Sequence, residues 1–330
     1  MTGPYRPVEY DSDRLLRLEA FGGHWSGPPS VRRMSISVIP DFGKRLEALE
    51  AGDADVIYAY PPEHIAELEQ LGSGYDVASW PSMRMHSLQL NCIRPPFDDV
   101  AVRKATSLAI DRNSLITEVL GGHGAAAYGL VPPWSVEAGE VCAGADLAAA
   151  DQLLERAGWT MGSDGVRHKG AQRLAFTLYT PTGPVLAMCA LAARIAEQLA
   201  PLGYAITPQE VPALSGAVKD GAYAAALRTG YSQLTGDPYF WLKLWLSQDG
   251  RANPGPSYVN PDLDALLDDY ASETQPHRRQ AYRRRIDALL TDDVPHVFLV
   301  FVPLILVARQ GRLASLTRDP NNEYFVSGGR

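Results

Sequence analysis

The chain has 330 residues, which is enough for a large buried core and for more than one lobe. Hydrophobic residues make up 46% and charged residues 21%, an ordinary globular balance that excludes a disordered chain. The formal net charge of −8 argues against a nucleic acid as partner, because proteins that bind phosphate backbones usually carry a clustered basic patch.

Strand and helix patterns alternate in the N-terminal part of the chain. Alternating apolar residues predict strands, and apolar residues at helical spacing between capping signals predict helices. The predicted strands are Met34–Ile39, Asp55–Tyr60 and Met85–Asn91, and the predicted helices run from Pro40-Asp41 to Gly52 and over Glu63–Leu71.

Helices become longer after Pro95-Pro96. Asp98 or Asp99 can cap the first, Asp111 the second, and Asp146 and Gly158 bracket a third. The later predictions are a strand over Leu174–Thr180, a helix over Val185–Leu202, a strand around Arg228, a helix through Leu290 and an apolar strand over Phe298–Val307. Because helices and strands alternate throughout, the predicted fold class is α/β.

Three further segments limit the class of protein. The arginine-rich cluster Arg278–Arg285 is predicted to form a solvated helix face, since apolar residues recur between its charges. The longest apolar run, Val297–Ala308, is shorter than the ~20 residues of a membrane-spanning helix. The first ten residues do not resemble a secretory signal, so the chain, if complete as given, is expected in the cytoplasm.

Several spaced motifs resemble the extracytoplasmic solute-binding proteins of the peptide, dipeptide and nickel class of ABC importers, family 5. The motifs are Thr2–Tyr5, LEALEAGDADVIY at Leu46–Tyr58, LQLNCIRPPFDDVAVRKATSLAIDRNSL at Leu88–Leu115, GLVPPW at Gly129–Trp134, LLERAGW at Leu153–Trp159, IAEQLAPLGY at Ile195–Tyr204, YVNPDLDALLDD at Tyr258–Asp269 and Pro295–Phe301. In this order, the motifs extend over essentially the whole chain. The resemblance implies a two-lobed periplasmic-binding-protein-like (type II) clamshell and a role in capturing a peptide or related small polar solute for ABC permease subunits.

The resemblance also implies that the first lobe is incomplete, because the family's Gly-Pro-Tyr motif lies well inside the chain and here it begins at Gly3. Residues 1–92 and 302–330 are expected to form the remnant of lobe I, and residues 93–301 lobe II. The hinge crossings are expected near Asn91 and Val302. A sheet edge left exposed in lobe I would make the chain less stable or more prone to association.

The stretch LRTGYSQLTGDPYF, Leu227–Phe240, resembles the strand and Asp-Pro turn that line the ligand cleft in oligopeptide-binding relatives. An extended ligand would pair with this strand as an added strand. The predicted ligand-binding residues are Arg228, Gly230, Tyr231, Ser232, Leu234 and Asp237. The resemblance assigns Arg228 to a ligand carboxylate, and Gly230 and Ser232 to main-chain contacts.

One position departs from the peptide-binding members, which carry an aspartate for the ligand's α-ammonium group where this chain has Leu234. An unpaired buried ammonium group is costly, so we expect a ligand with a carboxylate but no obligatory amine. Such a ligand could be a modified peptide, a sugar or a secondary metabolite. Asp237 is expected to act mainly in the turn.

Metal binding and catalysis are not expected. Leu227–Phe240 contains no histidine, and the three cysteines are far apart in sequence, so neither nickel nor another metal is predicted. The chain lacks a phosphate loop, and Gly230-Tyr231-Ser232 does not complete a nucleophile elbow, so no catalytic residue and no cofactor is predicted. A truncated ligand-sensing or partner-binding module, or a binding fold repurposed as an enzyme, stays the alternative.

Overall fold

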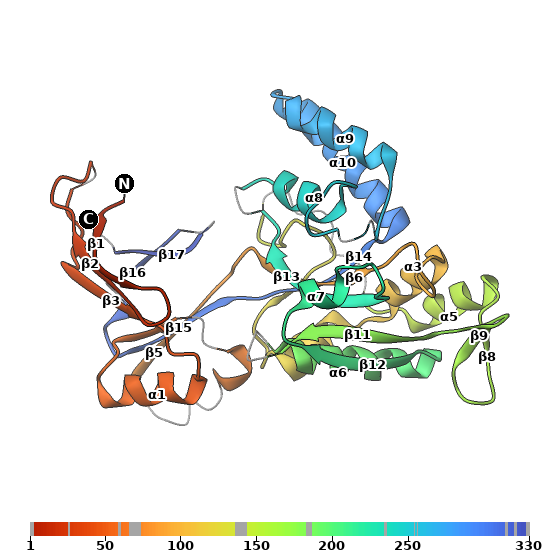
Figure 1. The fold of residues 1–330 in the computed structure, drawn as a ribbon, viewed down its shortest axis with the longest axis horizontal. Helices are drawn as coiled ribbons and strands as arrows, with labels where there is room; N and C mark the ends of the chain where they lie inside the picture. Colours follow the sequence, from red (N-terminus) through yellow and green to blue (C-terminus); the bar gives the residue numbers. More distant parts are fainter. Residues whose placement is uncertain are drawn as a thin grey trace. The chain divides into compact units, whose positions relative to one another are not determined.

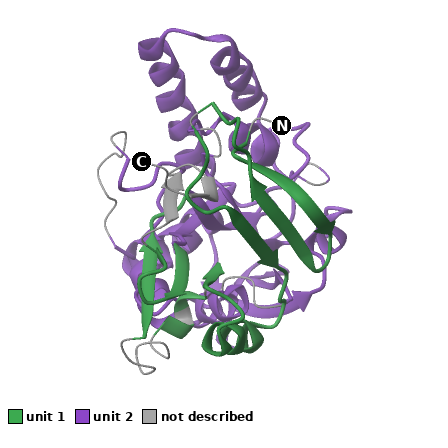
Figure 2. Cartoon of the chain, turned by 90° about the vertical axis from the view of Figure 1, so that its left-hand side faces the viewer, with its two compact units in different colours: residues 1–82, 304–330 green, residues 83–303 purple. Residues whose placement is uncertain are grey.

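The computed structural model describes residues 3–25, 27–58, 61–65, 74–135, 144–182, 187–233, 236–253, 255, 257–313, 316–319 and 322–327. The chain forms two compact units (Figure 2). The first comprises Met1–Ser82 and Leu304–Arg330, and the second comprises Met83–Pro303.

The first unit is built from small antiparallel sheets (Figure 1). Strands β1 (Tyr5–Asp11), β2 (Leu15–Ala20) and β3 (Arg33–Ser37) form one of them. Strand β15 (Leu304–Arg309) lies between β4 (Val56–Tyr58) and β5 (Tyr75–Trp80), and β16 (Leu316–Asp319) pairs with β17 (Asn322–Ser327). Helix α1 (Phe42–Ala51) supplies Leu49 to a small core with Ile57, Ile65, Ile305 and Val307.

A six-stranded mixed sheet with the order β12-β11-β13-β6-β14-β7 organises the second unit. The strands are β12 (Ala205–Val211), β11 (Ala175–Pro181), β13 (Ala225–Tyr231), β6 (Arg84–Leu90), β14 (His296–Phe301) and β7 (Ala125–Ala126). Strand β11 is parallel to β12 and β13, whereas each neighbouring pair along β13-β6-β14-β7 is antiparallel. A separate small sheet contains β8 (Thr160–Met161), β9 (Arg167–Lys169) and β10 (Gln172–Arg173).

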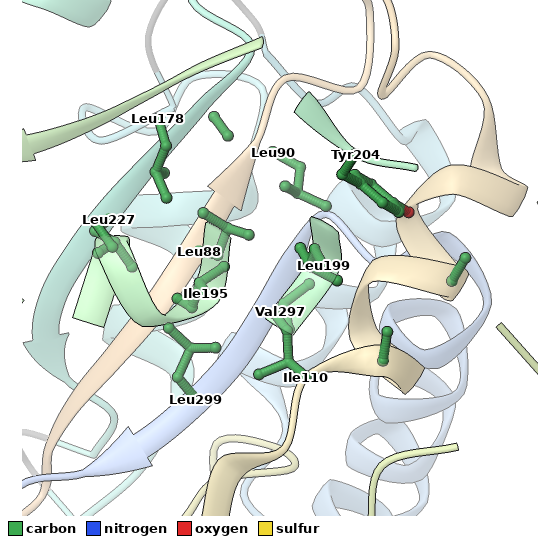
Figure 3. Packing of buried hydrophobic residues seen from close by; sticks show 14 of the residues in the cluster. Leu88, Leu90, Ile110, Leu178, Ile195, Leu199, Tyr204, Leu227, Val297 and Leu299 are labelled. Atoms are coloured by element: carbon green, nitrogen blue, oxygen red, sulfur yellow. The ribbon is translucent and has the colours of Figure 1, made fainter. Parts of the chain in front are cut away.

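Helices cover both faces of the six-stranded sheet. The larger core packs Leu88, Leu227 and Val297 against α3 (Val100–Ala109), α5 (Leu147–Arg156) and α6 (Met188–Leu199) (Figure 3). The second core holds Met85 and Phe298 with α8 (Tyr239–Leu246), α9 (Pro261–Ser272) and α10 (Pro276–Asp293). Short helices lie at Arg112–Ser114 (α4) and Leu214–Val218 (α7), with single turns at Pro62–His64, Leu115–Val119 and Ala200–Leu202. No helix among these described residues is long and apolar enough to cross a membrane.

The predicted helix caps are confirmed. The Asp99 side chain accepts a hydrogen bond from the Ala101 amide, and the Asp111 side chain accepts from Asn113 and Ser114. Gly52 ends α1 in the left-handed region, at φ 84°, where glycine has no steric penalty.

Three expectations differ from the structure. The apolar strand expected over Phe298–Val307 is wrong, because Val302-Pro303 separates β14 from β15 and the two strands join different sheets. The helix expected over Glu63–Leu71 is described only at Pro62–His64, as one 3-10 turn, and residues 66–71 lie outside the described residues. In the arginine-rich cluster, the prediction of a solvated face fails at Arg283, which is 9% exposed.

The units divide at Ser82/Met83 and Pro303/Leu304, whereas the sequence suggested crossings near Asn91 and Val302. The physical reason is that β6 pairs along its whole length with β13, and along most of it with β14. The assignment of these crossings as hinges stays a prediction.

Candidate functional site

Strand β13 carries the predicted site residues and is paired unequally on its two sides. All seven residues, Ala225–Tyr231, pair with β6. On the opposite side, β11 pairs only with Ala225 and Ala226. Beyond that point no other described strand pairs with this side of β13, and we call this side of Leu227–Tyr231 the open edge.

The register shows which backbone groups face that edge. The Asn91 amide donates to the Ala224 carbonyl and the Ser232 amide donates to the Met83 carbonyl. Because hydrogen-bonded pairs alternate in an antiparallel ladder without a bulge, the even-numbered residues of β13 direct their backbone groups toward β6. The backbone groups of Thr229, which is exposed, therefore point toward the open edge, and those of Arg228 and Gly230 do not.

Arg228 lies on the face of the sheet covered by α8, beside a buried glutamine. Its Nε donates to Gln89 Oε1 at 2.7 Å, and Gln89 Nε2 donates to the Ala252 carbonyl at 3.0 Å. The guanidinium carbon lies 5.4 Å from the ring centroid of Trp245. Burial lowers the pKa of Arg228, and Tyr223 acts in the opposite direction. No carboxylate among the described residues forms an ion pair with Arg228, so these residues do not neutralise its charge.

The same arginine lines a pocket of about 540 Å³. The other lining residues come from α7, from the residue that follows it and from the turn after α8: Ser215, Gly216, Val218, Lys219, Arg251 and Ala252. This volume lies within the range of small-molecule sites.

A buried histidine lies on the same face of the sheet. His296 Nδ1 is 3.2 Å from Ser87 Oγ, and its ring meets Trp241 and Trp245 edge to face at 5.1 and 5.9 Å. Burial, followed by the charge of Arg228, lowers the pKa of His296 to about 3. His296 is therefore neutral at physiological pH and adds no second cation beside Arg228.

Gly230, Tyr231 and Ser232 do not form one surface. A Cβ at Gly230 would lie 3.4 Å from Trp241 Nε1 and 3.5 Å from the Trp245 ring, so α8 covers that side of the glycine. Arg84 Nη2 donates to the Tyr231 hydroxyl at 2.9 Å. Ser232 is fully buried, and its hydroxyl has no hydrogen-bond partner in the described part of the chain. Leu234 lies outside the described residues.

Asp237 is held by three donors of the chain itself. The Tyr239 amide donates to its carboxylate at 2.7 Å, the Tyr270 hydroxyl at 2.8 Å and Arg279 Nη2 at 2.6 Å. Burial alone would raise the pKa of Asp237, but the hydrogen bonds from Tyr239, Tyr270 and Arg279 outweigh burial and lower it. The carboxylate thus joins the start of α8 to α9 and α10.

Replacing Asp237 with asparagine is expected to lower the free energy of unfolding at pH 7 by about 1 kcal/mol, since the carboxylate is one-third exposed and partly screened. The folded pKa is lowered, so this stabilisation is complete above the unfolded pKa of about 4 and is lost as the pH falls through the folded value. Urea denaturation of the wild type and of Asp237→Asn from pH 7 to pH 3 measures this effect. The difference between their free energies of unfolding should shrink below about pH 4. The exposed Asp98→Asn serves as control; a pH-independent difference for Asp237→Asn would contradict the prediction.

Sequence reasoning identified Arg228 but missed four residues that surround it: Gln89, Lys219, Trp245 and Arg251. Gln89 had only a weak signal, because it is one of four polar residues in the strand pattern Met85–Asn91, MHSLQLN. Lys219 and Arg251 had none, since they lie in separate segments that only the fold brings to one pocket.

Comparisons with known proteins decide the family. The family model described as "Bacterial extracellular solute-binding proteins, family 5 Middle" matches residues 1–253. The chain belongs to this family. The expected family, the α/β class and a binding protein rather than an enzyme are thereby confirmed.

Two curated relatives and one solved structure show the extent of the match. Protein XP55 of Streptomyces lividans is 30% identical over 314 residues, and the "Probable D,D-dipeptide-binding periplasmic protein DdpA" of Escherichia coli K12 is 26% identical over 306. These alignments cover 93% and 90% of the present chain and 56% of each relative. The chain therefore spans about half of the length of these relatives. NikA from Brucella suis in complex with Fe(III)-EDTA superposes with a TM-score of 0.83 at 24% identity, covering 99% of this chain and 68% of that one.

The described residues hold no cluster of three or more histidine, cysteine or acidic side chains that could bind a metal ion. At 24% identity, the likeness to NikA shows the fold alone.

Proposed function

We propose that the chain is the ligand-binding part of an ABC importer for carboxylate-bearing, peptide-like solutes, and that Arg228 holds the carboxylate. The observation that carries the proposal is the guanidinium of Arg228, which is partly buried, held by Gln89 and without an ion-pair partner in the described residues. A charge in this state is stabilised when a ligand anion occupies its free donors.

The open edge of β13 supports a peptide-like ligand. The amide and carbonyl of Thr229 point away from β6, and an extended main chain can pair with them by strand addition. This contact replaces the main-chain role that the sequence suggested for Gly230, whose backbone groups point toward β6 and whose outer side is covered by tryptophan rings.

The proposed ligand does not need a free amine. Leu234 stands where the peptide-binding members carry an aspartate, and the nearby Asp237 is already bonded to Arg279 and Tyr270. An unpaired buried ammonium group is costly, which favours a ligand that lacks one. As in the family, the place of action is proposed to be extracellular or periplasmic, with permease subunits receiving the ligand.

Calorimetry with matched di- to pentapeptides tests this function. Each peptide is offered as the free peptide, the N-acetylated acid and the N-acetylated C-terminal amide. We expect the acetylated acids to bind at least as tightly as the free peptides, and amidation to weaken binding by about 30-fold or more, because it removes the partner of Arg228. Binding that requires the amine and ignores the carboxylate would contradict the proposal.

A further inference from the structure

The pocket beside Arg228, which we call the cationic pocket, contains more positive charge than a single carboxylate requires. Its seven lining residues include Arg228, Lys219 and Arg251, and none of the seven is acidic. Although the chain has a net charge of −8, three cationic side chains and no carboxylate line this pocket.

None of these three cations forms an ion pair within the described part of the chain. Other basic residues of the same unit do: Arg279 pairs with Asp237 at 2.6 Å, and Lys243 pairs with Asp249 at 3.2 Å. Like charges that line a common pocket repel one another. The repulsion between the three cations therefore lowers the stability of the free protein, and an anion that binds in the pocket offsets this repulsion.

The surrounding structure holds the Arg228 side chain and the backbone of the turn that carries Arg251. Gln89 holds Arg228, and its amide also bonds the Ala252 carbonyl, next to Arg251. The turn that carries Arg251 is anchored by buried Asn253, whose Nδ2 donates to the Ser247 and Tyr258 carbonyls at 3.1 and 2.8 Å. Lys219 directly follows α7. Because its side chain is already held, Arg228 loses little conformational entropy when it binds an anion.

We propose that the cationic pocket binds a ligand group with two negative charges, the chemistry shared by phosphate groups and dicarboxylates, with Arg228, Lys219 and Arg251 as its partners. This inference rests on the proposed function in one respect, the assignment of Arg228 to the ligand. It narrows the solute class from any carboxylate to a dianion, because two cations remain after one carboxylate has been bound.

The test is calorimetry on the full chain with inorganic phosphate, glycerol 3-phosphate, succinate and acetate at matched ionic strength. We expect the dianions to bind at least about tenfold more tightly than acetate. A preference for phosphate and its ester indicates a phosphorylated solute, and a preference for succinate indicates a dicarboxylate.

Variants locate the binding. Lys219→Gln and Arg251→Gln are each expected to weaken dianion binding about fivefold and to leave acetate binding nearly unchanged. Arg285→Gln, which removes an equal charge from an exposed position on α10, is the matched control and should have no effect.

Dianions that bind no more tightly than acetate, or that bind both variants as tightly as the wild type, would overturn the inference. If acetylated peptide acids still bind through Arg228 in that case, the proposed function stands and only the dianion assignment fails. If dianions bind and peptide acids do not, the cationic pocket is confirmed and the peptide-like ligand is wrong.

Discussion

Replacing Arg112 with methionine is expected to lower the free energy of unfolding by about 3 to 5 kcal/mol, because buried carbonyl groups lose their donors. Arg112 begins α4 and is only 6% exposed. Its Nε donates to the carbonyls of Ala127 and Phe298 at 2.9 and 2.7 Å, and its Nη1 donates to the Ile110 carbonyl at 3.2 Å. Methionine keeps the apolar stem but cannot donate, and each buried acceptor left unsatisfied costs about 1 to 3 kcal/mol.

Chemical denaturation measures this effect. The control is Arg156→Met on α5, an exposed arginine that donates a 3.5 Å hydrogen bond to Gln152, and it should change the free energy of unfolding by less than about 0.5 kcal/mol. A loss below about 1 kcal/mol for Arg112→Met would show that water can satisfy the three carbonyls, contrary to this prediction.

The same substitution at Arg228 is expected to have a different profile, a large loss of ligand affinity with a smaller loss of stability. Burying the guanidinium costs a few kcal/mol. The hydrogen bond to Gln89 stabilises the folded state by about 1.5 to 3 kcal/mol, and the contact with the Trp245 ring stabilises it by about 0.5 to 2 kcal/mol. Because the buried Gln89 Oε1 also loses its donor, Arg228→Met should lower the free energy of unfolding by about 1 to 2 kcal/mol, well below the loss at Arg112.

Affinity for the tightest-binding acetylated peptide acid should fall by more than about 30-fold, because the variant loses the charged partner of the carboxylate. Calorimetry and denaturation on the same preparation separate the two effects, with Arg285→Met as a control for the loss of one charge. A destabilisation as large as that of Arg112→Met, with affinity retained, would show that Arg228 supports the fold and does not hold the ligand.

The comparison of these two arginines also shows how far the sequence predicts this protein. Local signals were sufficient for the caps at Asp99 and Asp111 and for the end of α1 at Gly52, because the partners lie within a few residues. The resemblance to the cleft strand of peptide-binding relatives suggested Arg228 as a ligand-binding residue, and that assignment stays a prediction. Nothing local distinguishes Arg228 from Arg112, since their partners at Gln89 and Phe298 are far away along the chain.

Long-range packing accounts for the remaining differences. Gly230 was expected to admit a ligand backbone, but α8 returns over it and places Trp241 and Trp245 there. The cationic pocket needs Lys219 and Arg251 from two separate segments, and no spacing in the sequence indicates that they meet. The apolar sequence continues through Val302-Pro303 and suggested a single strand. The strand ends there, because β14 and β15 belong to different sheets.

The Val302 amide donates to the Arg84 carbonyl at 2.9 Å, so the second unit begins and ends at neighbouring points on adjacent strands. The second unit is therefore one uninterrupted segment, Met83–Pro303, inserted into the first between Ser82 and Leu304. A segment with adjoining ends can be excised by two cuts or circularly permuted without stretching its chain. Residues 83–303 are thus a natural unit for recombinant expression, one that would carry Arg228, Lys219 and Arg251 together.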